Sequence, residues 1–520
     1  MSREKFTQPW TSQYSDQIES RLQKRDKLIE MGRNPYRNDL KADTKAKDLV
    51  NQYSHLAKED IGETPVFEMI GRVLLVRDFG KAAFLQIDDS TSRFQIYVKK
   101  KVTVDECFEE YKLLDYGDIV YAKGTLFKTN KGELTLEATH FHIVSKSIRP
   151  LPEKFHGLTD AELKYRMRYV DMIMNDETRK KLKTRSEIVR FIREYFYENE
   201  YLEVETPMMH SVAGGATAKP FMSHHNALDM ELFMRIAPEL HLKRLIVGGY
   251  HRVFEMNRCF RNEGLSVKHN PEFTSIEFYQ AYATYLDLMV LTEDLLSKLV
   301  LKVHKNESVI YGDRTISFAA PFKRLTLKQS VINHTHLDES DIGNKEALIK
   351  LLVDKDFKKV DLEKNSINKL MVLVFEEYVE DQLIQPTFIT QYPTEVSPLS
   401  RASDKDPDFV DRFELFINGW EIANAFSELN DPTDQLNRFA GQAMLKEDGD
   451  EEACEVDYDY VRALEYGMPP TAGEGIGIDR LVMILTNSTT IRDVILFPLL
   501  KKEHFFHENG SGDESEVDPN

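Results

Sequence analysis

The chain has 520 residues, of which 41% are hydrophobic and 30% are charged. This composition is typical of globular proteins and excludes collagen-like or globally disordered chains, and the length suits two or three domains. No apolar run approaches the roughly 20 residues of a membrane span, and the polar start Met1–Phe6 does not resemble a secretory signal. Cys107, Cys259 and Cys454 lie far apart, so we expect a reducing, cytoplasmic location, no membrane partner and no cysteine zinc site.

The net charge of −19 disfavours nucleic acid as a partner when it is averaged over the chain. The charge is uneven, however: residues 1–50 carry 11 Lys/Arg and 8 Asp/Glu, whereas residues 441–520 carry 6 and 18. A basic face near the start is therefore compatible with nucleic-acid binding. The last residues, 506–520, are acidic and poor in apolar side chains, which predicts a disordered tail.

Residues 1–60 are predicted to form a polar helical extension with a basic stretch at Arg21–Lys27, and a β-rich domain is expected over 61–148. The turn Thr129–Gly132 is typical of a hairpin. Five short strands predict a small OB-type barrel, with an unspecialised β-barrel as the alternative. The expected strands are Val66–Arg77, Ala82–Asp88, Phe94–Lys99, Ile119–Lys128 and Glu133–Val144.

Two prolines in Arg149–Pro152 stiffen the chain and predict a linker over 149–155, followed by a large domain over 156–505. A helix is expected over Asp176–Glu198, and an extended run Tyr201–Pro207 follows it. Further helices are expected near 285–303 and 365–380. The apolar residues of the first helix recur at helical spacing: Ile188, Phe191, Ile192, Tyr195 and Phe196.

Two consecutive strands of the large domain carry polar side chains on one face. Because unpaired charges in a buried sheet cost several kcal/mol, these faces predict a polar ligand, and a structural salt-bridge lattice is the alternative. The stretch Arg252–Glu263 contributes Glu255, Asn257, Arg261 and Glu263, and the stretch Pro271–Tyr279 contributes Phe273, Ser275, Glu277 and Tyr279.

Asn418-Gly419 is the strongest hairpin signal of the chain, and it pairs Phe416 with Glu421. Glu414 then lies on the face of Glu421 as a diagonal neighbour, about 7–8 Å away between Cα atoms. Two carboxylates that close suit Mg²⁺, which takes its other ligands from water and phosphates; solvated glutamates are the alternative. Strand parity does not place Asn424 or Glu428 on this face without a bulge.

A third stretch, Pro469–Leu485, combines Gly473, Gly475 and Gly477 with a buried helix that begins near Arg480. A glycine-rich turn before a helix is more often structural than functional. Arg480 is a fixed cation just inside the helix start, where the helix dipole does not favour it, so a nearby anion or stacked aromatic base is expected.

Taken together, these stretches resemble the signature motifs of the class II aminoacyl-tRNA synthetases, and more narrowly the lysyl-tRNA synthetases. The resemblance covers about residues 20 to 502. The first motif of the class, which in the family builds the dimer interface, is matched by the helix Asp176–Glu198 together with Tyr201–Pro207. The other motifs of the class are matched by Phe260–Glu263, His269–Thr274 and Gly475–Arg480. Those similar to the lysyl enzymes are Gly214–Ala216, His224–Asp229, Arg235–Leu240 and Phe426–Asp431.

The resemblance implies an α+β fold: a five-stranded OB-fold barrel followed by a catalytic domain built on an antiparallel sheet flanked by helices. It implies a homodimer that activates lysine with ATP and Mg²⁺ to lysyl-adenylate and then charges lysine tRNA. Arg261 is implied as the catalytic residue that holds the lysine carboxylate and the α-phosphate. Glu414 and Glu421 are implied as magnesium ligands that also contact ATP.

The other roles also follow from the resemblance. The lysine-binding residues are implied to be Gly215, Glu239, Glu277, Tyr279, Asn424 and Glu428. The remaining ATP contacts are implied to be Glu263, His269, Asn270, Phe273 and Arg480. Arg77, Phe84 and Gln95 match residues that read the tRNA anticodon. Glu474 departs from the family pattern, which is usually apolar there. Two rivals stay open: a related synthetase for aspartate or asparagine, and a binding protein without activity.

Overall fold

The computed structural model describes residues 15–152, 161–216, 218–355, 357–447 and 455–501. The chain divides into two compact units: residues 1–159 with 501–520, here called the barrel unit, and residues 160–500, the large unit. The boundaries drawn from the sequence remain predictions, and the expected tail at 506–520 lies outside the described residues. Within the described ranges, no helix has the length and apolar character needed to cross a membrane.

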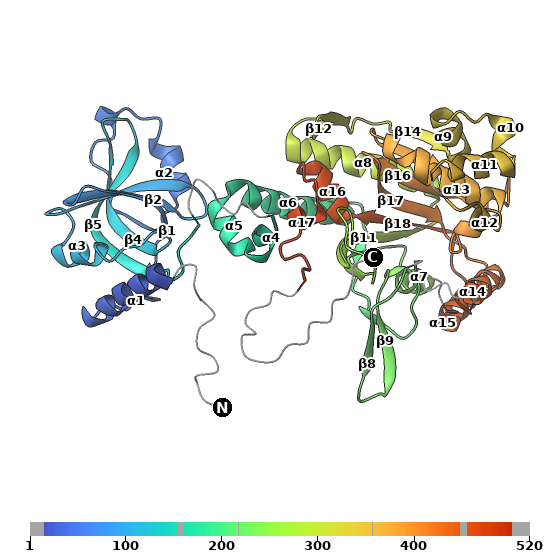
Figure 1. Cartoon of the computed structure of the whole chain (residues 1–520), viewed down its shortest axis with the longest axis horizontal. Helices are drawn as coiled ribbons and strands as arrows, with labels where there is room; N and C mark the ends of the chain where they lie inside the picture. Colours follow the sequence, from blue (N-terminus) through green and yellow to red (C-terminus); the bar gives the residue numbers. More distant parts are fainter. Residues whose placement is uncertain (1–14, 153–160, 217, 356, 448–454, 502–520) are drawn as a thin grey trace. The chain divides into compact units, whose positions relative to one another are not determined.

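The barrel unit is a closed five-stranded barrel in the order β1-β2-β3-β5-β4, as the alternating strands predicted (Figure 1). Its interior is a continuous core that includes Leu85, Ile96 and Phe141. The strands are β1 (Phe67–Asp78), β2 (Ala82–Asp88), β3 (Arg93–Lys99), β4 (Ile119–Lys128) and β5 (Leu134–Ser145). The helices are α1 (Ser15–Glu30), α2 (Ala46–Tyr53) and α3 (Asp105–Tyr111).

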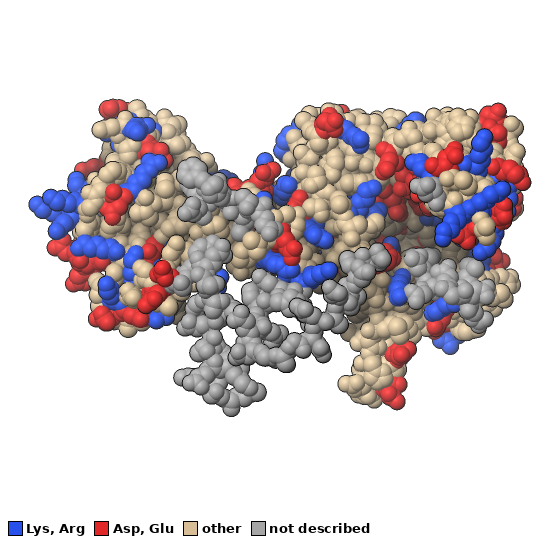
Figure 2. Space-filling view, in the orientation of Figure 1, with Lys and Arg blue, Asp and Glu red and all other residues tan. Residues whose placement is uncertain are grey.

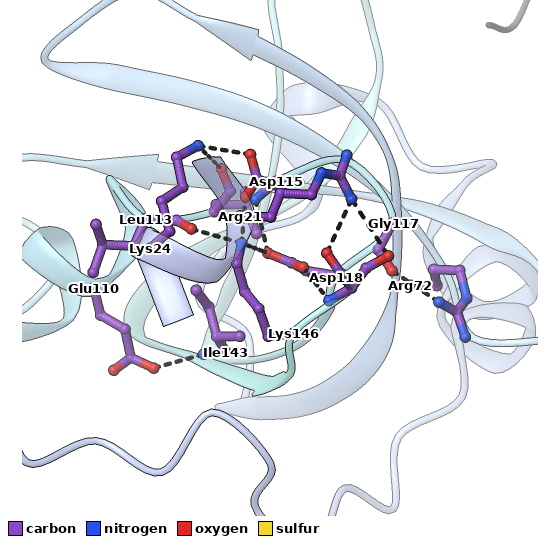
Figure 3. A network of polar contacts seen from close by, with 12 residues as sticks. Arg21, Lys24, Arg72, Glu110, Leu113, Asp115, Gly117, Asp118, Ile143 and Lys146 are labelled. Atoms are coloured by element: carbon purple, nitrogen blue, oxygen red, sulfur yellow. Dashed lines mark hydrogen bonds and ion pairs between the residues drawn. The ribbon is translucent and has the colours of Figure 1, made fainter. Parts of the chain in front are cut away.

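A buried charge network fixes helix α1 to the barrel (Figure 3). The ammonium of Lys146 is fully buried and lies 2.5 Å from Asp115 and 2.7 Å from Asp118. Lys24 of α1 adds a second cation 2.6 Å from Asp115, and Arg21 donates to the Ser147 carbonyl. Two cations of the basic stretch, Arg21 and Lys24, are thus held by the barrel.

Replacing Lys146 with methionine is expected to destabilise the barrel unit by about 3–5 kcal/mol, because Asp118 then stays buried without its cation. Urea unfolding of the full chain, followed by circular dichroism, measures this loss in the transition of the barrel unit. The matched control is Lys123→Met, since Lys123 pairs with Glu68 on the exposed barrel surface and should change stability by less than about 1 kcal/mol. Equal losses in both variants would contradict the role given to the network.

The large unit is built on an eight-stranded, mostly antiparallel sheet in the order β14-β15-β16-β17-β18-β11-β10-β6 (Figure 1). Helices α6 (Asp176–Glu198), α8 (Tyr285–His304) and α16 (Ile478–Leu485) share one hydrophobic core with strands of this sheet. The strands are β6 (Leu202–Glu203), β10 (Arg252–Phe260), β11 (Glu272–Ala281), β14 (Lys323–Thr326), β15 (Thr387–Thr390), β16 (Arg412–Ile417), β17 (Trp420–Ser427) and β18 (Thr471–Gly477).

The alternate side chains of these strands point away from that core. Tyr279 and Val253 join a separate cluster with α7 (Glu239–Val247) and α15 (Tyr458–Glu465). Helices α9 (Leu327–His334), α11 (Lys345–Val353) and α13 (Ile367–Tyr378) form a third cluster with β15 and β16. A three-stranded sheet, β7 (Met209–His210), β9 (Met230–Met234) and β8 (Met222–His225), completes the unit with the hairpin β12 (Ser308–Tyr311) and β13 (Arg314–Ser317).

The two polar strands and the hairpin form as predicted. Strands β10 and β11 pair antiparallel with Glu255 opposite Glu277. Between β16 and β17, Asn418 and Gly419 both have positive φ (55° and 70°), as a type I′ turn requires. The pairing of Phe416 with Glu421 is confirmed. Strand and turn signals in the sequence therefore place the polar faces correctly.

A β-bulge in β17 explains the position of Asn424, which strand parity alone did not predict. Leu415 pairs with Ala423 while Phe416 pairs with Glu421, so Ile422 is the extra residue of β17. Beyond the bulge, Asn424 lies directly opposite Glu414. A bulge reverses the side-chain alternation of one strand, which brings Asn424 to the face of Glu421.

Candidate active site

A cavity of about 240 Å³ lies on the polar face of the large-unit sheet. It brings together most of the site residues that the sequence predicts, and a second, adjoining cavity has Glu414 in its wall. The predicted residues lining the first cavity are Gly215, Glu239, Arg261, Glu263, His269, Asn270, Phe273, Glu277, Tyr279, Glu421, Asn424 and Arg480. Glu428 lines neither of these two cavities.

Arg261 follows the end of β10 and stays in line with it, because its backbone NH donates to the Pro271 carbonyl at 2.9 Å. Its guanidinium lies 5.1 Å from the ring centroid of Phe273, so the aromatic ring fixes its plane. Its Nε is buried without a hydrogen-bond acceptor among the described residues. A buried donor without a partner is costly, so this arginine is prepared to bind an anion in the cavity.

Arg480 lies in the first turn of α16 and joins two other residues of the cavity wall. It donates to the Glu421 carbonyl at 2.8 Å and contacts His269 Nε2 at 2.9 Å. Burial and the Arg480 charge lower the pKa of His269, so its imidazole is neutral and accepts this hydrogen bond at neutral pH. The cavity wall thus contains a second cation whose position is fixed by hydrogen bonds.

Glu414 and Glu421 are the predicted metal ligands. Burial raises the pKa of Glu414 to about 7, Arg412 opposes this shift and the neighbouring Glu421 adds to it. Arg412 lies 2.5 Å from Glu414, and Tyr392 donates to the other oxygen at 2.7 Å. Two carboxylates that repel each other at a cavity wall fit a divalent cation that takes its remaining ligands from phosphate and water.

Glu380 is a third carboxylate near this pair that the sequence did not reveal. Burial raises its pKa to about 8, and the charges of Glu414, Glu376 and Glu421 add to the shift. The sequence analysis did not identify Arg412 as a site residue either. Besides its ion pair with Glu414, Arg412 donates a hydrogen bond to the Asn424 side chain at 3.0 Å. Glu380 comes from a 3-10 turn (Glu380–Gln382) far from β16 in the sequence, so no local pattern identifies it.

Another part of the cavity wall is acidic and includes Glu239, the first residue of α7. Burial, together with Glu239 and Glu255, raises the pKa of Glu277 to about 8. The hydroxyl of Tyr279 donates to Glu277 at 3.3 Å. A Cβ on Gly473 would lie only 2.2 Å from the Tyr279 ring and 2.3 Å from Glu428 Oε1, so glycine is required where these two side chains meet. Glu428 is therefore buried against the cavity wall rather than exposed in it.

Two further buried charged side chains, Lys243 and Glu474, lie near these residues, and only Lys243 contacts the acidic group. Lys243, one helical turn after Glu239, is ion-paired with both Glu239 and Glu428, which sequence reasoning missed. Its spacing of four residues from Glu239 was the available signal. Glu474, by contrast, turns its carboxylate away into the core, where Thr292 donates to it at 2.7 Å.

The three predicted anticodon residues lie on neighbouring strands of the barrel unit. Arg77 pairs with Phe84 between β1 and β2, and Gln95 donates to Thr135 at 2.8 Å. The Phe84 ring stacks on Tyr97, with centroids 4.5 Å apart. Basic and acidic side chains are interspersed over the visible face of the unit (Figure 2). Phe84 is thus part of an aromatic surface on the outside of the barrel rather than a plain core residue.

Comparisons with known proteins agree with this geometry. The family described as tRNA synthetases class II (D, K and N) matches residues 160–501, and that described as OB-fold nucleic acid binding domain matches residues 67–144. A Lysine--tRNA ligase of Nitrosomonas europaea is 51% identical over 90% of this chain and 94% of its own length. One of Legionella pneumophila (strain Lens) is 51% identical over 93% of this chain and 97% of its own. One of Pseudomonas syringae pv. syringae is 52% identical over 90% of this chain and 92% of its own length. The resemblance read from the motifs is confirmed, and the chain belongs to the class II tRNA synthetase family.

Proposed function

We propose that this chain is a lysine--tRNA ligase, which joins L-lysine to the 3′ end of lysine tRNA at the expense of ATP. The observation that carries this function is a cavity whose wall combines two fixed cations with buried carboxylates, in a chain about half identical to lysine--tRNA ligases over most of its length. A substrate with two amines and one carboxylate matches this distribution of charge. A pocket for aspartate would need a cation where the acidic part of the wall lies.

In the first step, a carboxylate oxygen of lysine attacks the α-phosphorus of ATP, the bond to the β-phosphate breaks and pyrophosphate leaves. Arg261 binds the lysine carboxylate and the α-phosphate, because its planar donor fork suits two oxygens at once. Arg480 stacks against the adenine, His269 contacts a phosphate, and Glu263, Asn270 and Phe273 surround the base. No protein nucleophile is needed, since alignment and charge stabilisation suffice for this reaction.

In the second step, a hydroxyl of the terminal ribose of tRNA attacks the adenylate carbonyl, and AMP leaves. The α-amine of lysine is bound by Gly215 and Glu239, and its ε-amine by Tyr279 and Glu428. Two further residues complete this assignment: Glu277 lies beside the ε-amine end and Asn424 lies near the carboxylate. Support comes from the lining of the first cavity, which contains all of these residues except Glu428, and from the contact of Glu428 with the back of that wall at Gly473.

Glu414 and Glu421 would hold Mg²⁺, which neutralises the phosphate charge when it is bound. Arg412 and Tyr392 orient Glu414 for this role, because each engages one of its oxygens. The raised pKa of Glu414 is consistent with a site where a second positive charge offsets the repulsion from Glu421.

The direct test is lysine-dependent exchange of pyrophosphate into ATP, with aspartate and asparagine as comparison substrates. We expect exchange with lysine and none above background with the other two. Exchange with aspartate or asparagine would favour the related synthetases, and failure to form any adenylate with Mg²⁺-ATP present would favour a binding protein without activity.

For the barrel unit, we propose that Arg77, Phe84 and Gln95 read the tRNA anticodon. Replacing Phe84 with alanine is expected to weaken binding of lysine tRNA by about 1–3 kcal/mol, because one base loses its stacking partner. Filter binding at fixed salt measures this change. The control is Tyr36→Ala, since Tyr36 is an exposed aromatic of the same unit outside the Phe84–Tyr97 surface. Equal losses in both variants would count against this assignment.

We further propose a homodimer that acts in the cytoplasm. The exposed side chains of Tyr197 on α6 and of Leu202 on β6 fall in the motif that the family uses for its dimer interface. The described cysteines, Cys107 and Cys259, are free, which is consistent with a reducing compartment. Sedimentation equilibrium of the full chain tests the dimer.

A further inference from the structure

Lys243 is a buried cation beside the acidic part of the cavity wall. It lies on α7, and its ammonium is fully buried and ion-paired with Glu239 of the same helix and with Glu428 after β17. The rings of Phe426 and Tyr460 lie 5.3 and 5.9 Å from the ammonium. Two carboxylates and two aromatic faces therefore surround this charge, which is the environment that a free alkylammonium group would require.

Lys243 does not line either of the two cavities, whereas Glu239 lines both. It therefore contacts the carboxylates from behind and leaves the cavity open. Glu239, Glu277 and Glu428 are three acidic groups that lie around this one buried ammonium, and burial raises the pKa of both Glu277 and Glu428. The proposed substrate brings two more ammonium groups, which favour the ionised form of these carboxyls as Lys243 does.

The ionisation of these groups depends on their mutual placement. Burial alone lowers the pKa of Lys243, but Glu239 and Glu428 outweigh burial and raise it, so this lysine is charged. Burial raises the pKa of Glu428, and Lys243 opposes that shift. The groups that face Glu428 come from three elements: Glu239 and Lys243 of α7, Glu277 and Tyr279 of β11, and Tyr460 of α15.

We propose that Lys243 is a positioning residue for the amino-acid substrate: its ammonium bridges Glu239 and Glu428 and holds the two carboxylates in place for the amines of the substrate. The inference rests on the proposed function, which places the α-amine at Glu239 and the ε-amine at Glu428. Lys243 opposes the rise in the pKa of Glu428, so without this bridge the pair Glu239 and Glu428 holds a proton more tightly. A substrate ammonium must then displace that proton before it binds.

The test variant is Lys243→Met, which keeps the length of the side chain and removes its charge. We expect the KM for lysine in pyrophosphate exchange to rise about tenfold to a hundredfold, because buried acidic groups lose a partner, while the KM for ATP changes less than about twofold. Isothermal titration of lysine at pH 7 in two buffers of different ionisation enthalpy counts the protons released on binding. The variant should release more protons than the original protein.

The matched control is Arg244→Met, one residue later on the same helix. Arg244 is also a cation near Tyr460, but it pairs with Asp457 of the α15 N-cap rather than with the cavity carboxylates. We expect this control to leave the lysine KM and the proton release unchanged. Lys243→Arg should restore part of the lysine affinity, since it returns the charge, and thermal unfolding shows whether each variant is folded.

Unchanged lysine KM and proton release in a folded Lys243→Met variant would overturn the inference, as would an equal rise in the KM values for lysine and ATP. Lysine-dependent exchange measured on the original protein distinguishes this outcome from failure of the proposed function. If the original protein shows no lysine-dependent exchange, the function is wrong; if it exchanges normally and the variant matches it, only the role of Lys243 is wrong.

Discussion

Arg261→Met is expected to lower the rate of lysyl-adenylate formation by about 10²–10³-fold, because it removes a preorganised cation where negative charge spreads in the transition state. The guanidinium has an aromatic face on Phe273 and a buried Nε without an acceptor, so its position is set before the substrate arrives. Most of the loss should therefore appear in kcat rather than in the KM for ATP. Rapid-quench measurement of adenylate formation with saturating lysine and ATP gives this rate.

Arg258→Met is the matched control for this prediction. Arg258 lies on the same strand, β10, but its side chain is 43% exposed and pairs with Glu272 at 3.4 Å. Its removal should leave adenylate formation within about twofold, because exposed ion pairs contribute little. A similar loss in both variants would mean that strand β10, rather than the Arg261 charge, carries the effect.

Local patterns predicted the barrel and several elements of the large unit, whereas the antiparallel sheet of the large unit was implied by the family resemblance. The barrel strands alternate between buried and half-exposed residues, so a period of two identified all five within one residue at each end. Helix α6 carries an apolar stripe at helical spacing, and its predicted bounds are those observed. The turn residues Asn418 and Gly419 fixed the register of β16 and β17, because few other residues adopt positive φ at both positions.

The rest of the site depends on contacts that no local pattern encodes. The bulge at Ile422 places Asn424 opposite Glu414, and nothing in the side chains of β17 marks where its extra residue falls. Lys243 has an acidic neighbour one turn away, as exposed helices often do, so only its burial reveals its role. Arg21 belongs to a basic stretch of a polar helix, and only the folded structure shows that its guanidinium is held against carbonyl groups of the barrel unit. Tertiary packing decided each of these cases.

Glu428→Gln is expected to raise the KM for lysine by about 10²-fold while the KM for ATP changes less than about twofold. The substitution keeps the shape of the side chain and removes the carboxylate charge that we propose binds the ε-amine. A charged hydrogen bond of this kind contributes about 1.5–3 kcal/mol. Steady-state pyrophosphate exchange with each substrate varied in turn separates the two constants. Equal increases in both would defeat the assignment of Glu428 to the ε-amine.

The chain offers Glu474→Gln as a matched control, since Glu474 is also a buried glutamate of the sheet, 2% exposed, but points into the core at Thr292. Burial raises its pKa well above the ordinary value, so the folded state favours the protonated form. A carboxyl whose pKa is higher in the folded than in the unfolded protein lowers the free energy of unfolding once the pH exceeds its pKa in the unfolded chain. Glutamine does not ionise, so the substitution removes this loss of stability. We therefore expect Glu474→Gln to leave the lysine KM unchanged and to raise the free energy of unfolding more at pH 8 than at pH 5. The same substitution should thus raise the lysine KM at Glu428, which we assign to substrate binding, and leave it unchanged at Glu474, which only fills the core.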